Sequence, residues 1–86
     1  MENLKSIKVK VFYEGEIKKI TKKDFDEPLI SEGQPFAYFL YFIFSSYPEI
    51  TKKFLPGKLG FSLNNVPPRD FDVLKNNDEI KIISFL

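Results

Sequence analysis

Hydrophobic and polar residues alternate near the start of the chain with the period of a β-strand. The apolar side of this alternation consists of Ile7, Val9, Val11 and Tyr13. A period of two predicts a strand with one buried face. Glu14-Gly15 follows, and because glycine readily takes a positive φ, we expect a tight turn and a return strand over Glu16–Thr21. The spacing of Ile17 and Ile20 breaks strict alternation and predicts a bulge or an early end to that strand.

The middle of the chain predicts one main helix. Lys22–Gln34 is polar and reads as a loop. A helix is predicted over Pro35–Ser46, since proline suits the first turn of a helix, where its missing N–H costs nothing. The helix should weaken at Tyr47, because the following proline disfavours the α conformation there. Pro48–Leu55 then predicts a second, shorter helical piece.

The last third of the chain returns to a strand pattern. Leu59–Leu63 alternates apolar and small or polar residues and predicts a strand, and Asn64-Asn65 suits a turn. The prolines of Val66–Pro68 cannot donate ladder hydrogen bonds, so any strand there is short and at an edge. Asp78–Leu86 predicts a buried final strand.

The order of these elements is strand, strand, helix, strand, short strand, strand. One helix can cover only one face of a sheet of four or five strands, which predicts an α+β fold. The first and last strands are the most apolar, so we place them side by side and parallel at the centre of a mixed sheet. With one main helix across one face, this is the ubiquitin-like β-grasp arrangement. We expect a single domain over residues 1–86.

Composition narrows the possible functions. Thirteen Lys and Arg against twelve Asp and Glu give a formal net charge of +1, so nucleic-acid binding is not expected despite several lysine clusters. The chain has no cysteine, which removes thiolate nucleophiles and Cys-based metal sites, and no histidine, which is the commonest general base and metal ligand. The longest apolar run, Phe36–Phe44, is about half as long as a membrane span requires. No signal peptide is evident, and we expect a cytoplasmic protein that does not bind membranes.

Three segments resemble the small sulfur-carrier proteins of the MoaD/ThiS type. Tyr47-Pro48-Glu49-Ile50 is similar to the "YPEL" that closes the helix in molybdopterin synthase small subunits. Leu59–Val66 is similar to the strand and turn with "VNG", and Val73–Ile82 to "L-x-x-G-D-E-V-x-I". Length and element order agree over nearly the whole chain. The motifs are moderately specific, since other β-grasp domains such as TGS share the last of them.

The resemblance implies a chemistry for which the printed sequence lacks one part. Family carriers end in Gly-Gly, whose carboxylate is adenylated and converted to a thiocarboxylate, whereas this sequence ends in Ser84-Phe85-Leu86. Asn77 stands where the family usually has glycine. We therefore expect a non-enzymatic docking or carrier-like subunit, in sulfur transfer or in molybdopterin or tungstopterin cofactor biosynthesis. The implied partner is an activating enzyme or a larger synthase-type subunit. The alternatives are a true sulfur carrier whose Gly-Gly tail is not part of this sequence, and a TGS-like module that binds RNA or a ligand.

The acidic residues near the end of the chain admit two interpretations. Asp70, Asp72, Asp78 and Glu79 could form a metal or acid–base site if they converged in a pocket. Each also stands where turns favour Asp, and we expect solvated turn residues. No nucleophile–base pair, phosphate loop or metal-ligand spacing is present. We expect no catalytic, cofactor-binding or metal-binding residues.

Two apolar surfaces are predicted to bind partners, and a homo-oligomer is possible. The outer side of the predicted helix carries Tyr38, Tyr41 and Phe42 where charge is usual. These are either covered by Lys22–Gln34 or Glu49–Leu55, or they form an exposed patch that contacts another subunit. On the uncovered sheet face, Phe12, Ile83 and Phe85 either form an apolar island, or a chain terminus or a neighbouring molecule in a crystal covers Ile83 or Phe85. The predicted partner-binding residues are Phe12, Tyr38, Tyr41, Phe42, Ile83, Phe85 and Leu86.

Overall fold

A computed structural model describes residues 5–85, apart from the side chain of Pro56. Its elements follow in the order β1 (Ser6–Lys8), β2 (Lys10–Glu14), the 3₁₀ helix η1 (Gly15–Ile17), α1 (Lys18–Thr21), β3 (Phe25–Asp26), β4 (Leu29–Ser31), α2 (Phe36–Ser46), α3 (Glu49–Lys53), the 3₁₀ helix η2 (Pro56–Lys58), β5 (Leu59–Leu63) and β6 (Glu79–Ser84). The main helix, the short helix after it and the strands β5 and β6 confirm the sequence-based predictions, whereas the short strand predicted at Val66–Pro68 is absent and Val66 makes only an isolated bridge to Leu63. Within residues 5–85, no helix is long and apolar enough to cross a membrane.

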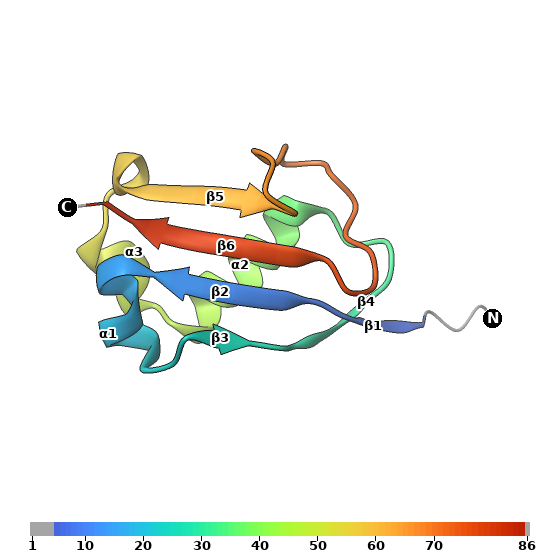
Figure 1. Cartoon of the computed structure of the whole chain (residues 1–86), viewed down its shortest axis with the longest axis horizontal. Helices are drawn as coiled ribbons and strands as arrows, with labels where there is room; N and C mark the ends of the chain where they lie inside the picture. The colour runs from blue at the N-terminus through green and yellow to red at the C-terminus, as the bar shows by residue number, and fades with distance from the viewer. Residues whose placement is uncertain (1–4, 86) are drawn as a thin grey trace.

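The main sheet has the strand order β3-β2-β6-β5, with the first and last long strands at its centre (Figure 1). β2 and β6 are parallel, and their register places Val11 beside Ile80 and Tyr13 beside Ile82. β5 completes the sheet by pairing antiparallel with β6, and β3 pairs antiparallel with β2. β1 and β4 form a separate antiparallel pair beyond one end of the sheet. The predicted α+β, β-grasp arrangement is confirmed.

The hydrophobic core lies between the sheet and α2, which crosses behind it in the view of Figure 1. Phe36, Phe39 and Ile43 are the buried residues of α2, as its helical spacing predicts, and they pack against the alternate residues of β2 and β6. Among the described elements, none covers the opposite face of the sheet, which faces the viewer in Figure 1.

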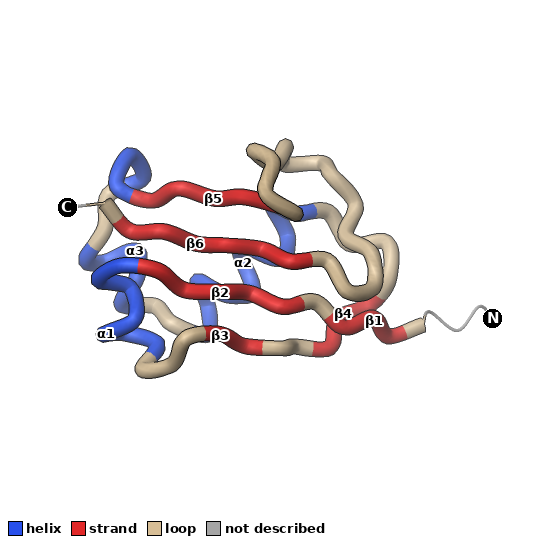
Figure 2. The backbone as a smooth tube through the Cα atoms, in the orientation of Figure 1, coloured by secondary structure: helices blue, strands red, loops and turns tan. Residues whose placement is uncertain are grey.

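The predicted return strand over Glu16–Thr21 is wrong. This segment forms η1 and α1, drawn in blue between β2 and β3 in Figure 2. Ile17 and Thr21 are both buried, and their separation of four residues is the spacing of one helix face. The interrupted alternation was therefore the signal of a helical turn and not of a bulged strand.

A close contact between this helical turn and the end of β6 explains the turn's conformation. Gly15 has φ +86°, and a Cβ at this position would lie 2.6 Å from Ser84 Oγ. The backbone N–H of Ile17 donates to the same oxygen at 3.0 Å. Glycine is thus required twice, for its positive φ and for the space that Ser84 occupies.

The prediction of a loop over Lys22–Gln34 is wrong in part. β3 and β4 both lie within it, and they pair with β2 and β1. They are two and three residues long, too short to give a clear alternating pattern. Turn geometry was predicted better: Asn64, Asn65 and Asn77 all have positive φ.

Candidate functional site

The predicted island on the open face of the sheet is present as an arrangement of side chains. Phe12 and Ile83 are half-buried on neighbouring strands, in positions offset by two residues in the β2–β6 register. Phe85 is 51% exposed, and its ring lies over Gly60, 2.8 Å from where a Cβ would be. Gly60 thus leaves room for the ring on the sheet surface. Leu86, the remaining predicted residue of this group, lies outside the described residues.

Phe25 extends the open-face group and was missed in the sequence. It pairs directly with Phe12, with ring centroids 6.0 Å apart. Lys10 Nζ lies 4.2 Å from the Phe25 centroid and 5.0 Å from that of Phe12. The lysine ammonium therefore lies over both rings and makes a cation–π interaction with each. The sequence signal for Phe25 was weak, because this residue is one apolar residue in a polar stretch. We call Phe12, Phe25, Ile83 and Phe85 the open-face cluster.

The predicted patch on α2 is exposed, so the interpretation that neighbouring segments bury it is wrong. Tyr38, Tyr41 and Phe42 are 60%, 72% and 44% exposed. Neither the segment before α2 nor α3 covers them. Because α2 lies behind the sheet, this patch and the open-face cluster are on opposite sides of the molecule (Figure 1). The predicted partner-binding residues therefore form two separate surfaces.

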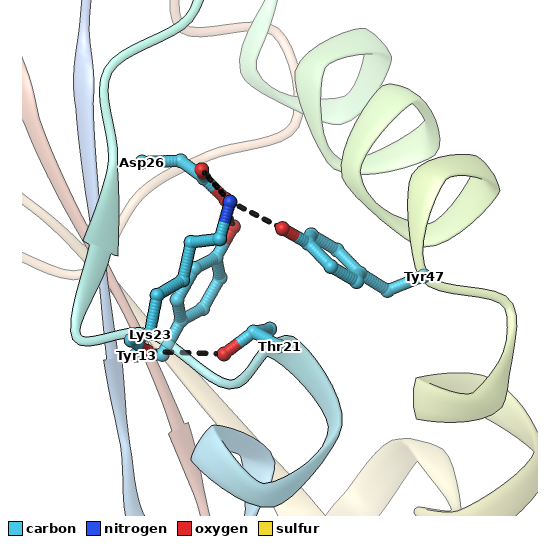
Figure 3. Close-up of polar contacts among 5 residues, drawn as sticks. All are labelled: Tyr13, Thr21, Lys23, Asp26 and Tyr47. Atoms are coloured by element: carbon cyan, nitrogen blue, oxygen red, sulfur yellow. Dashed lines mark hydrogen bonds and ion pairs between the residues drawn. The ribbon is translucent and has the colours of Figure 1, made fainter.

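A group of hydrogen-bonded polar side chains, which the sequence did not predict, centres on the carboxylate of Asp26 in β3 (Figure 3). Its Oδ2 accepts hydrogen bonds from the hydroxyls of Tyr13 at 2.7 Å and Tyr47 at 2.8 Å. Lys23 Nζ donates to Oδ1 at 2.9 Å. These side chains come from β2, from the segment after α1 and from the end of α2. The sequence signal was two tyrosines at core positions, since a buried tyrosine hydroxyl needs a partner.

Electrostatics in this Asp26 cluster favour a structural role. Burial raises the pKa of Asp26, but the hydrogen bonds from Tyr13, Lys23 and Tyr47 outweigh burial and hold this pKa below its ordinary value. Burial, followed by the bond to Asp26, raises the pKa of Tyr13 far above its usual range. The pKa of Tyr47 is raised by the same two causes. A carboxylate this well stabilised is a weak base, and such tyrosines hold their protons, so the cluster joins three segments and is unsuited to proton transfer.

A cleft of about 250 Å³ opens beside the Asp26 cluster, between the β3 side of the sheet and the second half of α2. Its lining consists of Asp26, Glu27, Pro28, Phe42, Ile43, Ser46 and Tyr47. Both oxygens of Asp26 are already engaged by protein donors. The cleft thus offers the exposed side chains of Phe42 and Glu27 but no free oxygen of Asp26.

Among the acidic residues near the end of the sequence, Asp72 and Asp78 serve as turn residues, whereas the turn interpretation of Glu79 is wrong because this residue begins β6. Asp72 Oδ2 accepts from the backbone N–H of Arg69 at 2.8 Å, and Asp78 Oδ2 accepts from that of Lys75 at the same distance. In the described range 5–85, no group of three or more acidic side chains could hold a metal ion. The turn interpretation of Asp72 and Asp78 is confirmed.

Comparison with solved structures shows that this fold is shared by small MoaD-like and SAMP-like proteins. A Pyrococcus furiosus protein assigned as molybdopterin converting factor, subunit 1, superposes with a TM-score of 0.80 at 18% identity, covering 93% of this chain and 99% of its own. The Haloferax volcanii HVO 2177 protein gives 0.80 at 6% identity, over 100% of this chain and 90% of its own. SAMP1 from Haloferax volcanii gives 0.78 at 7% identity, over 92% and 96%. No family model matches the sequence, and a comparison with curated proteins gave no match either.

Proposed function

We propose that this protein is a non-enzymatic subunit that docks on a partner protein through the open-face cluster. The observation that carries the proposal is an apolar group on a sheet face that no described element covers. Phe25 and Phe85 are each more than two-fifths exposed, and they flank half-buried Phe12 and Ile83. Exposed aromatic groups of this kind are enriched at the centres of protein interfaces.

The polar residues around the cluster suit a docking surface. Lys10 and Lys81 stand on the same face as Phe12 and flank it on β2 and β6. An apolar centre with a polar rim is the usual composition of an interface between proteins that also exist apart.

The biological setting is proposed from likeness. One similar structure is named as a molybdopterin converting factor subunit, and the motifs around Tyr47-Pro48 and Asp78-Glu79 resemble those of sulfur carriers. We therefore place the protein in sulfur transfer or in molybdopterin or tungstopterin cofactor biosynthesis. Its partner would be an activating enzyme or a larger synthase-type subunit.

The experiment is a binding assay with a matched pair of substitutions. Phe85→Ser removes an exposed ring from the open-face cluster, and Phe71→Ser removes a still more exposed ring from the loop before β6. Native protein is mixed with the activating enzyme and, separately, the larger synthase-type subunit of the same organism, and affinity is measured by isothermal calorimetry. We expect Phe85→Ser to weaken binding about tenfold or more and Phe71→Ser to leave it unchanged.

Two results would contradict the proposal. Equal affinity of both variants would exclude the open face, and no binding of the native protein to either enzyme would exclude the pathway. The intact mass of the native protein, recorded before and after incubation with the activating enzyme, ATP and a sulfur donor, separates the two modes of action. A carrier gains the mass of exchanging one carboxylate oxygen for sulfur, whereas a docking subunit keeps its mass.

A further inference from the structure

Among the described residues, 5–85, β5 is a free edge of the main sheet, and its sequence lacks the usual protection of such edges. It follows β6 at the end of the strand order, and its sequence, Leu59-Gly60-Phe61-Ser62-Leu63, contains no charged residue and no proline. Edge strands of soluble proteins normally carry lysine, proline or a bulge, because an unprotected edge pairs with other strands. The opposite edge, β3, is only two residues long.

The backbone of β5 presents hydrogen-bonding groups outward at two residues. The N–H of Phe85 donates to Lys58 and that of Asn64 to Glu79, which marks these as hydrogen-bonded pairs of the β5–β6 ladder. Because such pairs alternate along antiparallel strands, Gly60 and Ser62 also bond to β6, and Leu59, Phe61 and Leu63 point their N–H and C=O away from it. Leu63 is bonded to Val66 in both directions. Within residues 5–85, the outward groups of Leu59 and Phe61 have no backbone partner.

An apolar groove runs along the helix side of this edge. Its volume is about 270 Å³, and its lining consists of Leu40, Phe44, Thr51, Phe54, Leu59 and Phe61. Leu59 and Phe61 belong to both features, since their backbone forms the free edge and their side chains form one wall of the groove. A strand added at this edge would receive backbone hydrogen bonds and place alternate side chains in the groove.

We propose that the occupant of this edge is the β5 strand of a second copy of the chain, in an antiparallel two-fold dimer centred on Gly60. In this register, Leu59 of each copy forms a hydrogen-bonded pair with Phe61 of the other. The outward N–H and C=O groups of both residues in both copies then all find partners. A centre at Phe61 would instead require the outward groups of Leu63, which Val66 already occupies.

Two features of the chain favour a second copy over another strand. Leu59 and Phe61 would meet on the helix side and join the two grooves into one apolar surface. The nearest charged residue, Lys58, would face Ser62 and not another charge, and the net charge of +1 gives little repulsion between copies.

Disulfide cross-linking tests the register directly, because the chain has no cysteine of its own. In the proposed dimer, residues 58 and 62 of different copies have Cα atoms about 4.5 Å apart, within the span of a disulfide. In one chain the same residues are about 13 Å apart along the strand and cannot be bridged. We expect Lys58→Cys/Ser62→Cys to oxidise to a covalent dimer with two disulfides. Each single variant serves as a control and should cross-link only at the rate of random collision.

A charge variant and sedimentation equilibrium complete the test without cysteine. The native protein should show a monomer–dimer equilibrium, which Ser62→Lys should weaken about tenfold at low salt by facing Lys58, and less at high salt. Lys58→Glu/Ser62→Lys should restore it, and Lys75→Glu should have no effect. A protein that stays monomeric at millimolar concentration overturns the proposal. A dimer whose dissociation constant is unchanged by these substitutions would also overturn it, as would a β5 edge that binds only a strand of another protein.

Discussion

Replacing Asp26 by Asn tests how much the Asp26 cluster stabilises the fold. The side chain keeps its shape and loses its charge, so the hydroxyls of Tyr13 and Tyr47 would donate to a neutral oxygen. Hydrogen bonds to a charged acceptor are stronger than neutral ones by about 1 kcal/mol each, which gives a loss of about 2 kcal/mol for the two bonds. The exposed ammonium of Lys23 adds little to this figure.

The loss should depend on pH in a defined direction. The folded protein holds the pKa of Asp26 below its ordinary value, so its stabilisation is complete above the unfolded-state pKa and disappears as the pH falls through the folded-state pKa. We therefore expect Asp26→Asn to be destabilising by about 2 kcal/mol near pH 7. In strong acid, where the native carboxyl is also protonated, the difference between the two proteins should vanish.

The assay is urea unfolding followed by far-ultraviolet circular dichroism over a series of pH values. Asp24→Asn is the matched control, because the side chain of Asp24 is 80% exposed and only faces Lys18 at 3.3 Å. It should change the free energy of unfolding little at any pH. The reasoning would be refuted if Asp26→Asn cost no more than this control, or if its cost were the same in acid as near neutral pH.

Three further substitutions test other parts of the structure. Gly15→Ala should destabilise the protein by about 2 kcal/mol or more in urea unfolding. Gly33→Ala should cost only about 1 kcal/mol, because Gly33 has a similar φ but open space around it. Ser84→Ala should cost about 1–3 kcal/mol in the same assay, because it leaves a buried N–H without its acceptor; no loss would mean that water replaces the hydroxyl. Replacing Tyr41 and Phe42 together by Glu should weaken any complex in which another subunit covers α2. The molar mass of the complex is measured by light scattering, and an unchanged mass would exclude a contact through these two residues.

The sequence predicts those elements of the fold whose patterns are long. The segment Ile7–Tyr13, which the structure divides between β1 and β2, and the segment of β6 carry alternating apolar residues, and α2 repeats an apolar face through three turns. Their type and the parallel pairing of β2 with β6 could therefore be inferred. α1 has four residues and β3 has two, which is too few for either period to stand out. Their conformation depends on tertiary contacts, such as the bond between Ile17 and Ser84.

The candidate surfaces were predictable to different degrees for the same reason. Phe12 and Ile83 could be placed on one face by counting residues along strands whose pairing was known. Phe25 could not, because its strand was not recognised. The Asp26 cluster joins three segments, so no local pattern contains it, and only the need of Tyr13 for a hydrogen-bond partner hinted at it.

The parallel pairing of β2 and β6 makes the order of folding depend on almost the whole chain. Lys10 lies beside Glu79, so the centre of the sheet forms only after the intervening loop has closed. Loop closure of this length slows folding and makes it cooperative, because the helix has no complete sheet to cover until both strands are present. During synthesis the N-terminal strand must therefore wait for the residues of β6 to leave the ribosome. Until then the sheet-facing side of α2, with Phe36, Phe39 and Ile43, stays available to chaperones.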